Sequence, residues 1–253
     1  MKRSILTLLI CMIGIWGSGF QGLLEAQEKP LRIYGPDGPS FPLRECADLL
    51  SQIYAIKAEV ITGPGATWIP RAREDADIVY EEAEHLLSQF MTRYPCLVDQ
   101  STRASLYLQP TGILVRKGNP KKIHSFEHLA GTNIYLLDVF GGAHAGLWED
   151  VAGLKDIIPG VRKRIVMSVE TGAEAVEKWK TVPELDAWVT FESWHVRLRD
   201  ASDWVRLPKG ERIYRGTAAV ITHFYKNRET ARMFMEFLQT RDCRAVFQKW
   251  GWE

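Results

Sequence analysis

Short apolar runs alternate along the chain with segments whose apolar residues recur at helical spacing. The apolar runs predict strands, and the segments between them predict helices that pack on a sheet. The expected strands are residues 31–34, 58–62, 77–80, 133–139, 164–169 and 186–191, and the expected helices are residues 42–54, 82–91, 125–129, 145–154, 172–180, 228–240 and 243–249. This alternation is typical of an α/β fold with mostly parallel sheets flanked by helices.

Two longer extended runs, residues 106–116 and 214–224, divide this pattern into two blocks. Because the last helices return to the first block, the pattern predicts a two-lobed clamp whose lobes are joined by two hinge crossings. The expected first lobe is residues 27–112 plus 217–253, and the expected second lobe is residues 113–216.

The first 26 residues predict a signal peptide. Lys2 and Arg3 precede an apolar run at residues 5–15, and small residues lead to Ala26. This layout is typical of secretion, and the apolar run is short for a membrane span, although an uncleaved anchor is the alternative. We therefore expect a periplasmic protein with a cleaved signal peptide.

Composition mainly excludes classes of partner and cofactor. Apolar residues make up 46% of the chain, which is enough for a core. Without residues 1–26 the acidic and basic side chains balance, so no field of one sign favours nucleic acid or an anionic membrane. Cys46, Cys96 and Cys243 lack metal-binding spacing, and we expect no metal and no cofactor. An oxidising compartment allows one disulfide, but the sequence does not select its pair.

Three of the strands run directly into turns rich in Gly, Pro, Ser or Thr. They are LRIYGPDGPS at residues 31–40, AEVITGPGATW at residues 58–68 and NIYLLDVFGGAHAGLWED at residues 133–150. Such turns present backbone N–H groups at the start of a helix, where they suit an anion or a polyhydroxylated molecule. Three such turns together predict a ligand-binding cleft.

These and other strings resemble a known family. YGPDGPS, TGPGATW, LYLQPTGILVRKGNP, GGAHAGLWEDVAG, DAWVTFESW, YRGTAAVIT and FQKWGW are similar to the accessory colonization factor C family, over roughly residues 31–253. That family belongs to the type 2 periplasmic solute-binding proteins and is distantly related to the molybdate and sulfate binders. The resemblance implies the type 2 fold, secretion, a small anionic ligand and a membrane permease as partner, and it leaves a homodimer open.

The resemblance also implies which residues bind the ligand. They are Gly38, Pro39 and Ser40 in the first loop, Thr67 and Trp68 in the second, Thr111 and Gly112 in the hinge, Gly142, His144 and Gly146 in the second lobe, and Tyr214, Arg215 and Thr217 in the return crossing. Glu192 is a further candidate, because it lies just past a strand end. One segment departs from the family pattern, since Glu81 and Glu82 stand where a small Ser/Gly-rich loop is expected. Carboxylates there would repel an anion, so either they point to solvent or the ligand differs from the family's usual one.

Several of these candidates have a purely structural alternative. Ser40 is expected to cap its helix, with or without a ligand contact. Arg215 is the best charged candidate, because a guanidinium offers two parallel donors to an oxyanion, and a surface ion pair is its alternative. His144 is expected to donate to a ligand or to backbone, since it lacks neighbours at metal-ligand spacing. The glycines 141, 142 and 146 either serve the ligand or only permit a tight turn.

The sequence lacks the common enzyme motifs GxSxG, HExxH and GxxxxGK followed by Ser or Thr. We therefore predict a non-catalytic binding protein that captures a small oxyanion or organic acid, either sulfate- or molybdate-like or a phosphorylated or carboxylic acid, for an ABC-type permease. A secreted surface antigen or colonization factor without a transport role is the first alternative. A hydrolase built from His144 with Ser40 or a carboxylate is the second, and it predicts turnover.

Overall fold

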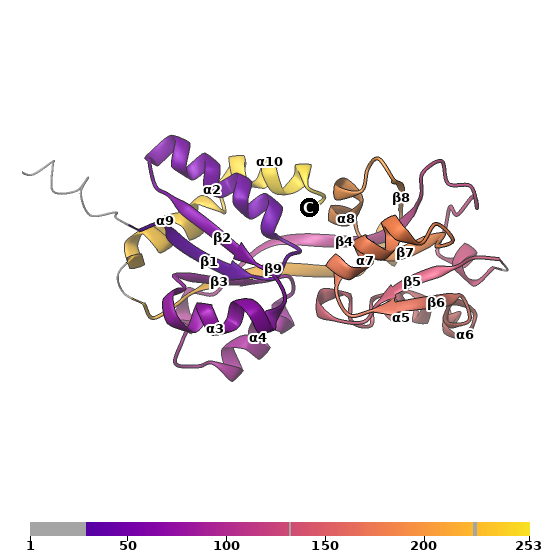
Figure 1. The fold of residues 1–253 in the computed structure, drawn as a ribbon, viewed down its shortest axis with the longest axis horizontal. Helices are drawn as coiled ribbons and strands as arrows, with labels where there is room; N and C mark the ends of the chain where they lie inside the picture. The colour runs from indigo at the N-terminus through magenta and orange to yellow at the C-terminus, as the bar shows by residue number, and fades with distance from the viewer. Residues whose placement is uncertain (1–28, 132, 225–226) are drawn as a thin grey trace, which may run out of the picture. The chain divides into compact units, whose positions relative to one another are not determined.

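In the computed structural model the strands lie in the order β2-β1-β3-β9-β4-β7-β5-β6, with β8 beside β4 (Figure 1). The structure describes residues 29–131, 133–224 and 227–253, so the expected signal peptide, residues 1–26, lies outside the described residues. The strands are β1 (Leu31–Gly35), β2 (Ala58–Thr62), β3 (Ile78–Glu81), β4 (Ala104–Arg116), β5 (Leu136–Val139), β6 (Ile165–Val169), β7 (Ala187–Phe191), β8 (Ser202–Arg206) and β9 (Tyr214–Ile221). The pairs of β1 with β2 and β3, and of β5 with β6 and β7, are parallel, which confirms the expected fold class.

Helices cover these strands on both faces. They are α2 (Ser40–Tyr54), α3 (Gly65–Asp75), α4 (Glu84–Arg93), α5 (Leu147–Gly153), α6 (Ile158–Arg162), α7 (Gly172–Thr181), α8 (Glu192–Arg197), α9 (Arg228–Phe237) and α10 (Arg241–Lys249). Figure 1 shows α3 and α4 on one side of the β2-β1-β3 strands and α2, α9 and α10 on the other. The sequence pattern did not give bounds for α3, α6, α8 or β8.

β4 and β9 are the two crossing strands. They pair antiparallel with each other, with Gln109 opposite Arg215 and Pro110 opposite Tyr214. β9 also pairs with β3 in one group of parallel strands, and β4 pairs with β7 in the other, so the two strands together connect the groups. The two predicted crossings are therefore present as one antiparallel pair, with a register shift between Ser105 and Leu108.

The buried residues form separate clusters on the two sides of these crossings. One large cluster spans Ile113 to Leu207 and also includes Ala83; we call this part of the chain the second half. Two further clusters, on opposite faces of β1 and β3, use residues between Leu31 and Tyr107 and between Ala218 and Trp252; we call this part the first half. Each half thus buries apolar side chains of its own, and this burial is the main stabilising term for each.

Two of the three cysteines in the described residues lie in the core of the first half. Cys46 on α2 and Cys243 on α10 are both fully buried, whereas Cys96 is exposed. The neighbouring Cys243 thiol, together with burial, raises the pKa of Cys46. All three described cysteines are free thiols, so the disulfide pair that the sequence left open is not settled.

Residues Leu31–Glu253 form one compact unit. Within the described ranges, no helix combines the length and the apolar character needed to cross a membrane.

Candidate functional site

The turn after β1 reaches across to the second half. Ser40 is completely buried, and its hydroxyl donates to the backbone oxygen of Asp37 at 2.8 Å. The expectation that Ser40 caps the helix is wrong, because Pro39 is the N-cap of α2 and Ser40 is already the first helical residue. The Ser40 hydroxyl instead holds the turn, whose backbone oxygens face Arg197.

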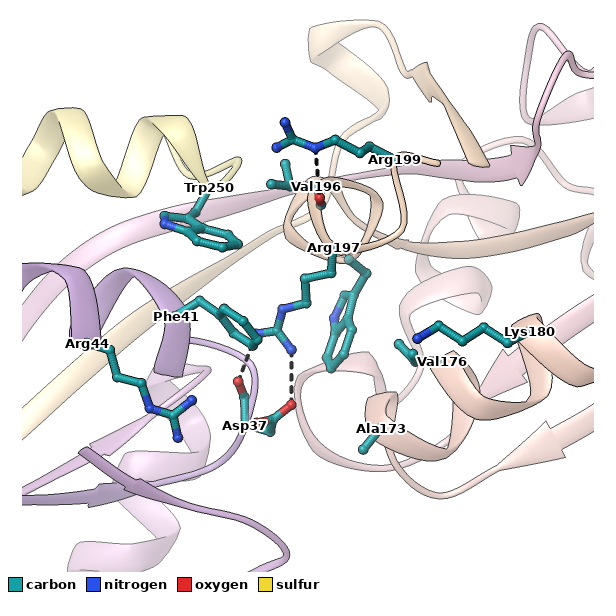
Figure 2. A pocket seen from close by; sticks show the side chains of 11 residues that line it. Asp37, Phe41, Arg44, Ala173, Val176, Lys180, Val196, Arg197, Arg199 and Trp250 are labelled. Atoms are coloured by element: carbon teal, nitrogen blue, oxygen red, sulfur yellow. Dashed lines mark hydrogen bonds and ion pairs between the residues drawn. The ribbon is translucent and has the colours of Figure 1, made fainter. Parts of the chain in front are cut away.

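Arg197 on α8 is the partner of this turn. Its guanidinium donates to the Asp37 carboxylate at 3.0 Å, to the Asp37 backbone oxygen at 2.9 Å and to the Gly38 backbone oxygen. The same group lies 4.1 Å from the centre of the Phe41 ring and 4.4 Å from that of Trp194 (Figure 2). Burial lowers the pKa of Arg197, and Asp37 opposes this shift. Arg197 thus joins the two halves through charge, hydrogen bonds and ring contacts.

A cavity of about 590 Å³ opens beside Arg197. Its lining comes from both halves: Asp37, Phe41, Arg44, Ala173, Val176, Lys180, Trp194, Val196, Arg197, Arg199 and Trp250 (Figure 2). Four of these side chains are cationic and one is a carboxylate. The lining therefore has a positive excess, which favours an anionic solute.

Glu82 lies on the other side of Gly38, in the segment between β3 and α4. Its Oε1 atom accepts a hydrogen bond from the backbone N–H of Ala143 in the second half at 2.8 Å. Burial raises the pKa of the Glu82 carboxyl, with Ala143 and Arg197 opposing the shift. Burial, with help from Glu82, raises the pKa of the neighbouring Glu81 to about 8. Of the two sequence alternatives for this segment, solvent exposure is therefore wrong for Glu82.

The Gly142–Gly146 turn brings a backbone donor to the site, but its histidine faces the core. Gly142 and Gly146 have φ values of 59° and 70°, which favour glycine. His144 is 3% exposed, and its Nε2 shares a hydrogen bond of 2.8 Å with the Thr190 hydroxyl. Its ring is stacked on Trp188. Burial and the charge of Arg215 lower the pKa of His144 to about 3, so the ring is neutral.

The crossing-strand candidates serve mainly to hold the two strands and the chain end together. The Thr111 hydroxyl donates to the Ile213 backbone oxygen at 2.6 Å, and the Thr217 hydroxyl accepts from Trp252 Nε1 at 2.9 Å. A Cβ atom on Gly112 would lie 2.2 Å from the Trp204 ring, so this glycine is needed for packing. The Tyr214 hydroxyl is buried without a hydrogen-bond partner among the described residues.

The sequence allows two roles for Arg215, a ligand contact and an ion pair, and the structure contains an ion pair. Its guanidinium donates to the Asp150 carboxylate at 3.0 Å, and its side chain is 18% exposed. Its Nε atom is buried and has no partner in the described part of the chain. Arg215 therefore has an ion pair and also a spare donor.

The side chains of the remaining candidates have partners outside the Gly38 turn. Thr67 is exposed, and its hydroxyl donates to the Pro64 backbone oxygen at 2.7 Å. Trp68 is 3% exposed and stacks on Phe90. The Glu192 carboxylate accepts from Arg206 at 2.7 Å.

The structure thus brings the turns that contain Gly38, Pro39, Ser40 and Gly142 close to Arg197 and Glu82. The sequence did not single out Arg197, and it marked Glu82 only as a departure from the family pattern. Arg197 follows Trp194 by three residues, a spacing that places both on one face of a helix, so recognition of α8 could have singled it out. Across residues 29–131, 133–224 and 227–253, no group of three or more His, Cys, Asp or Glu side chains is arranged to hold a metal ion.

The fold and the cleft match one class of protein. The family model described as bacterial extracellular solute-binding protein matches residues 31–253, and the chain belongs to this family. A comparison with curated protein sequences finds no match.

Solved structures of the same class resemble the chain over most of its length. Peb3 from Campylobacter jejuni is 27% identical, with a TM-score of 0.79 over 88% of this chain and 99% of that chain. The structure of PEB3 with bound L-phospholactate is 26% identical, with a TM-score of 0.80 and the same coverage of 88% and 99%. The periplasmic molybdate-binding protein of Azotobacter vinelandii is 11% identical, with a TM-score of 0.69 over 88% and 98% of the two chains, and it supports the fold alone.

Proposed function

We propose that the protein is a periplasmic solute-binding protein that captures a small oxyanion or organic acid between its two halves for an ABC-type permease. The observation that supports this most directly is the cavity beside Arg197, whose lining combines Arg44, Lys180, Arg197 and Arg199 with a single carboxylate, that of Asp37. The similarity to a protein solved with L-phospholactate agrees with an anionic solute.

The expected mechanism is closure about the two crossing strands. The proposed lobes are residues 27–112 plus 217–253 and residues 113–216, and residues 1–26 are the proposed cleaved signal peptide. A solute that contacts both lobes favours the closed arrangement, because only there do all its contacts form at once. Closure also excludes water, which strengthens each hydrogen bond to the solute.

Capture without catalysis is the form of this proposal that the contacts favour. The hydrolase alternative pairs His144 with Ser40 or with a carboxylate; for the first pair, His144 Nε2 is bonded to Thr190 and the Ser40 hydroxyl donates to Asp37. Turnover is therefore not expected from this pair.

A thermal-shift screen of residues 27–253 tests the proposal. Sulfate, molybdate, L-phospholactate and simple carboxylic acids form the anionic set, and thiamine, a cation, is the control of opposite charge. A ligand at about 100 times its Kd stabilises the folded state by about 2.7 kcal/mol, which is readily measured. Stabilisation by thiamine and by no anion would contradict the proposal.

A further inference from the structure

The Glu82 carboxylate lies between two glycine turns that come from different halves of the chain. A Cβ atom on Gly38 would lie 2.5 Å from Glu82 Oε2, and a Cβ atom on Gly142 would lie 2.2 Å from Oε1. Side-chain carbons do not approach that closely, so the space for the carboxylate exists because both positions are glycine. The two turns thus form a fitted slot around a negatively charged group.

The slot also provides a hydrogen-bond donor suited to an anion. Ala143 donates its backbone N–H to Glu82 Oε1 at 2.8 Å. A hydrogen bond from a backbone N–H to an ionised oxygen is stronger than a bond between neutral groups. Glu82 therefore uses the donor that the Gly142 turn would otherwise offer to a solute.

The backbone of Glu82 is held in place from the crossing strand. Gln109 on β4 donates through Nε2 to the Glu82 backbone oxygen at 3.3 Å, and its own Oε1 accepts from the Ser193 hydroxyl at 3.3 Å. The segment that bears the carboxylate is thus tied to the hinge and to α8. This support fixes the backbone from which the Glu82 side chain extends into the slot.

The charges around the slot oppose one another. Arg197 attracts the Glu82 carboxylate, Asp37 repels it, and Glu81 is the adjacent carboxyl. Glu82 is half-buried, and no guanidinium hydrogen bond to it is present among the described contacts. A group held this way can be exchanged for another anion more readily than one in a complete ion pair.

We propose that Glu82 determines the specificity of the cleft by holding an internal carboxylate in the place of a solute's anionic group. This inference rests on the proposed function, because it concerns anion capture between the same two halves. A solute anion reaches the Ala143 N–H only by displacing Glu82, which competes at the high effective concentration of a tethered group. A single small oxyanion such as sulfate is therefore disfavoured, and the cleft selects an acid that also contacts the cationic cavity beside Arg197.

The direct test is calorimetric titration of sulfate into the wild-type protein, Glu82→Ala, Glu82→Gln and Glu84→Ala. Glu84→Ala is the matched control, because it removes the same charge from a carboxylate that is paired elsewhere, with Arg103. We expect Glu82→Ala to bind sulfate at least about tenfold more tightly than wild type, since hydrogen bonds to charged groups contribute this much. Glu82→Gln should gain less, because its amide oxygen still accepts from Ala143. Glu84→Ala should change affinity less than about threefold. Equal sulfate affinity in wild type and Glu82→Ala would overturn the proposal.

A second test needs no ligand. Gly38→Ala should push the carboxylate out of the slot in the wild-type background but should be tolerated in Glu82→Ala. We expect the substitution to shift the unfolding equilibrium about fivefold more in the wild-type background than in the Glu82→Ala background, as for residues in direct contact. The same shift in both backgrounds would contradict the internal position of Glu82.

These two tests separate this inference from the proposed function. Absence of anion binding in every variant, with the Gly38 coupling present, would reject anion capture and support the position of Glu82. Tight anion binding with the same affinity in wild type and Glu82→Ala would support anion capture and reject the role of Glu82 in specificity.

Discussion

Two arginines, Arg197 and Arg215, lie where the halves of the molecule meet, and each donates to a carboxylate at 3.0 Å. Their surroundings differ. The Arg197 side chain is 10% exposed and also contacts two backbone oxygens and two aromatic rings. The partner of Arg215 is Asp150, which is 48% exposed. The two arginines therefore share the same distance to a carboxylate but differ in burial and in the number of groups that they contact.

The comparison teaches that the use of a guanidinium depends on how many of its donors the protein already occupies. The terminal nitrogens of Arg197 face acceptors of this chain, whereas Arg215 has one exposed partner. We therefore expect Arg197 to contribute mainly to stability and Arg215 mainly to binding. Substitutions at both positions can separate these roles.

The largest effect is expected for Arg197→Ala. The substitution leaves the Asp37 carboxylate and two backbone oxygens without their donor, and breaking a buried pair costs about 3–5 kcal/mol. Because Asp37 is 36% exposed, we expect the lower end, about 3 kcal/mol, from urea denaturation. Arg197→Lys should restore only part of this loss, since an ammonium lacks the planar set of donors. A smaller loss than that of Arg215→Ala would reverse the comparison.

Arg215→Ala should act on binding. We expect it to weaken binding of an anion identified by the screen ten- to hundredfold, since a charged hydrogen bond contributes about 1.5–3 kcal/mol. The free energy of unfolding without ligand should change by less than about 1 kcal/mol, because the pair with Asp150 is open to solvent. Arg215→Lys should recover part of the affinity. Unchanged calorimetric affinity in a folded Arg215→Ala variant would remove Arg215 from the site.

His144 extends the Arg215 region into the core and predicts a pH dependence. Its folded pKa of about 3 lies below the value of about 6.5 for an unfolded histidine. The unfolded state therefore takes up the proton first, so stability is full above pH 6.5 and falls as the pH drops toward 3. Between pH 7 and 5.5 the loss from this group is about 1.2 kcal/mol. Urea denaturation of His144→Phe should lack this part of the slope. Arg215→Ala removes only the smaller cause of the lowered pKa, so it should leave the slope in this range unchanged and reduce only the total loss near pH 3. Identical slopes in wild type and His144→Phe would contradict a neutral buried ring.

The smallest effect is expected at a third ion pair, between Glu192 and Arg206. Arg206 is 58% exposed, and such pairs contribute little. Arg206→Ala should change the free energy of unfolding by less than about 0.5 kcal/mol, measured under the conditions used for Arg197→Ala. A loss comparable to that of Arg197→Ala would mean that exposure does not explain the difference between these regions.

Most strands of the fold were predictable from the sequence because their apolar runs are short and end in turn residues, but β8 was not predicted. β2 was predicted with its observed bounds, 58–62, and the bounds of β1 were missed by one residue. The first and last residues of α3 and α8 were not predicted, for local reasons. α3 contains Pro70, which obscures a helical pattern, and α8 has six residues, too few to establish a period.

The centre of the cleft was less accessible from the sequence. The Gly38 and Gly142 turns were found, because glycine after a strand is a local signal. The sequence also marks the Glu82 carboxylate as unusual. The direction of the Glu82 side chain was not predictable, because it depends on two turns that are distant in the chain and meet only in the folded molecule. Arg197 was missed for the same reason, since its acceptors lie in the turn after β1.

The return of the chain end to the first half has a consequence for the order of events during synthesis. The core of the second half comes from residues 113–207 together with Ala83, but the cluster of the first half around Leu31 includes Phe247 and Trp252. Glu253 exchanges backbone hydrogen bonds with Leu108, at 2.8 and 3.3 Å. The cluster around Leu31 is therefore completed only when α10 and the residues after it join, whereas the cluster around Tyr34 uses no residue beyond Val220. That cluster and the core of the second half can form earlier in synthesis than the cluster around Leu31.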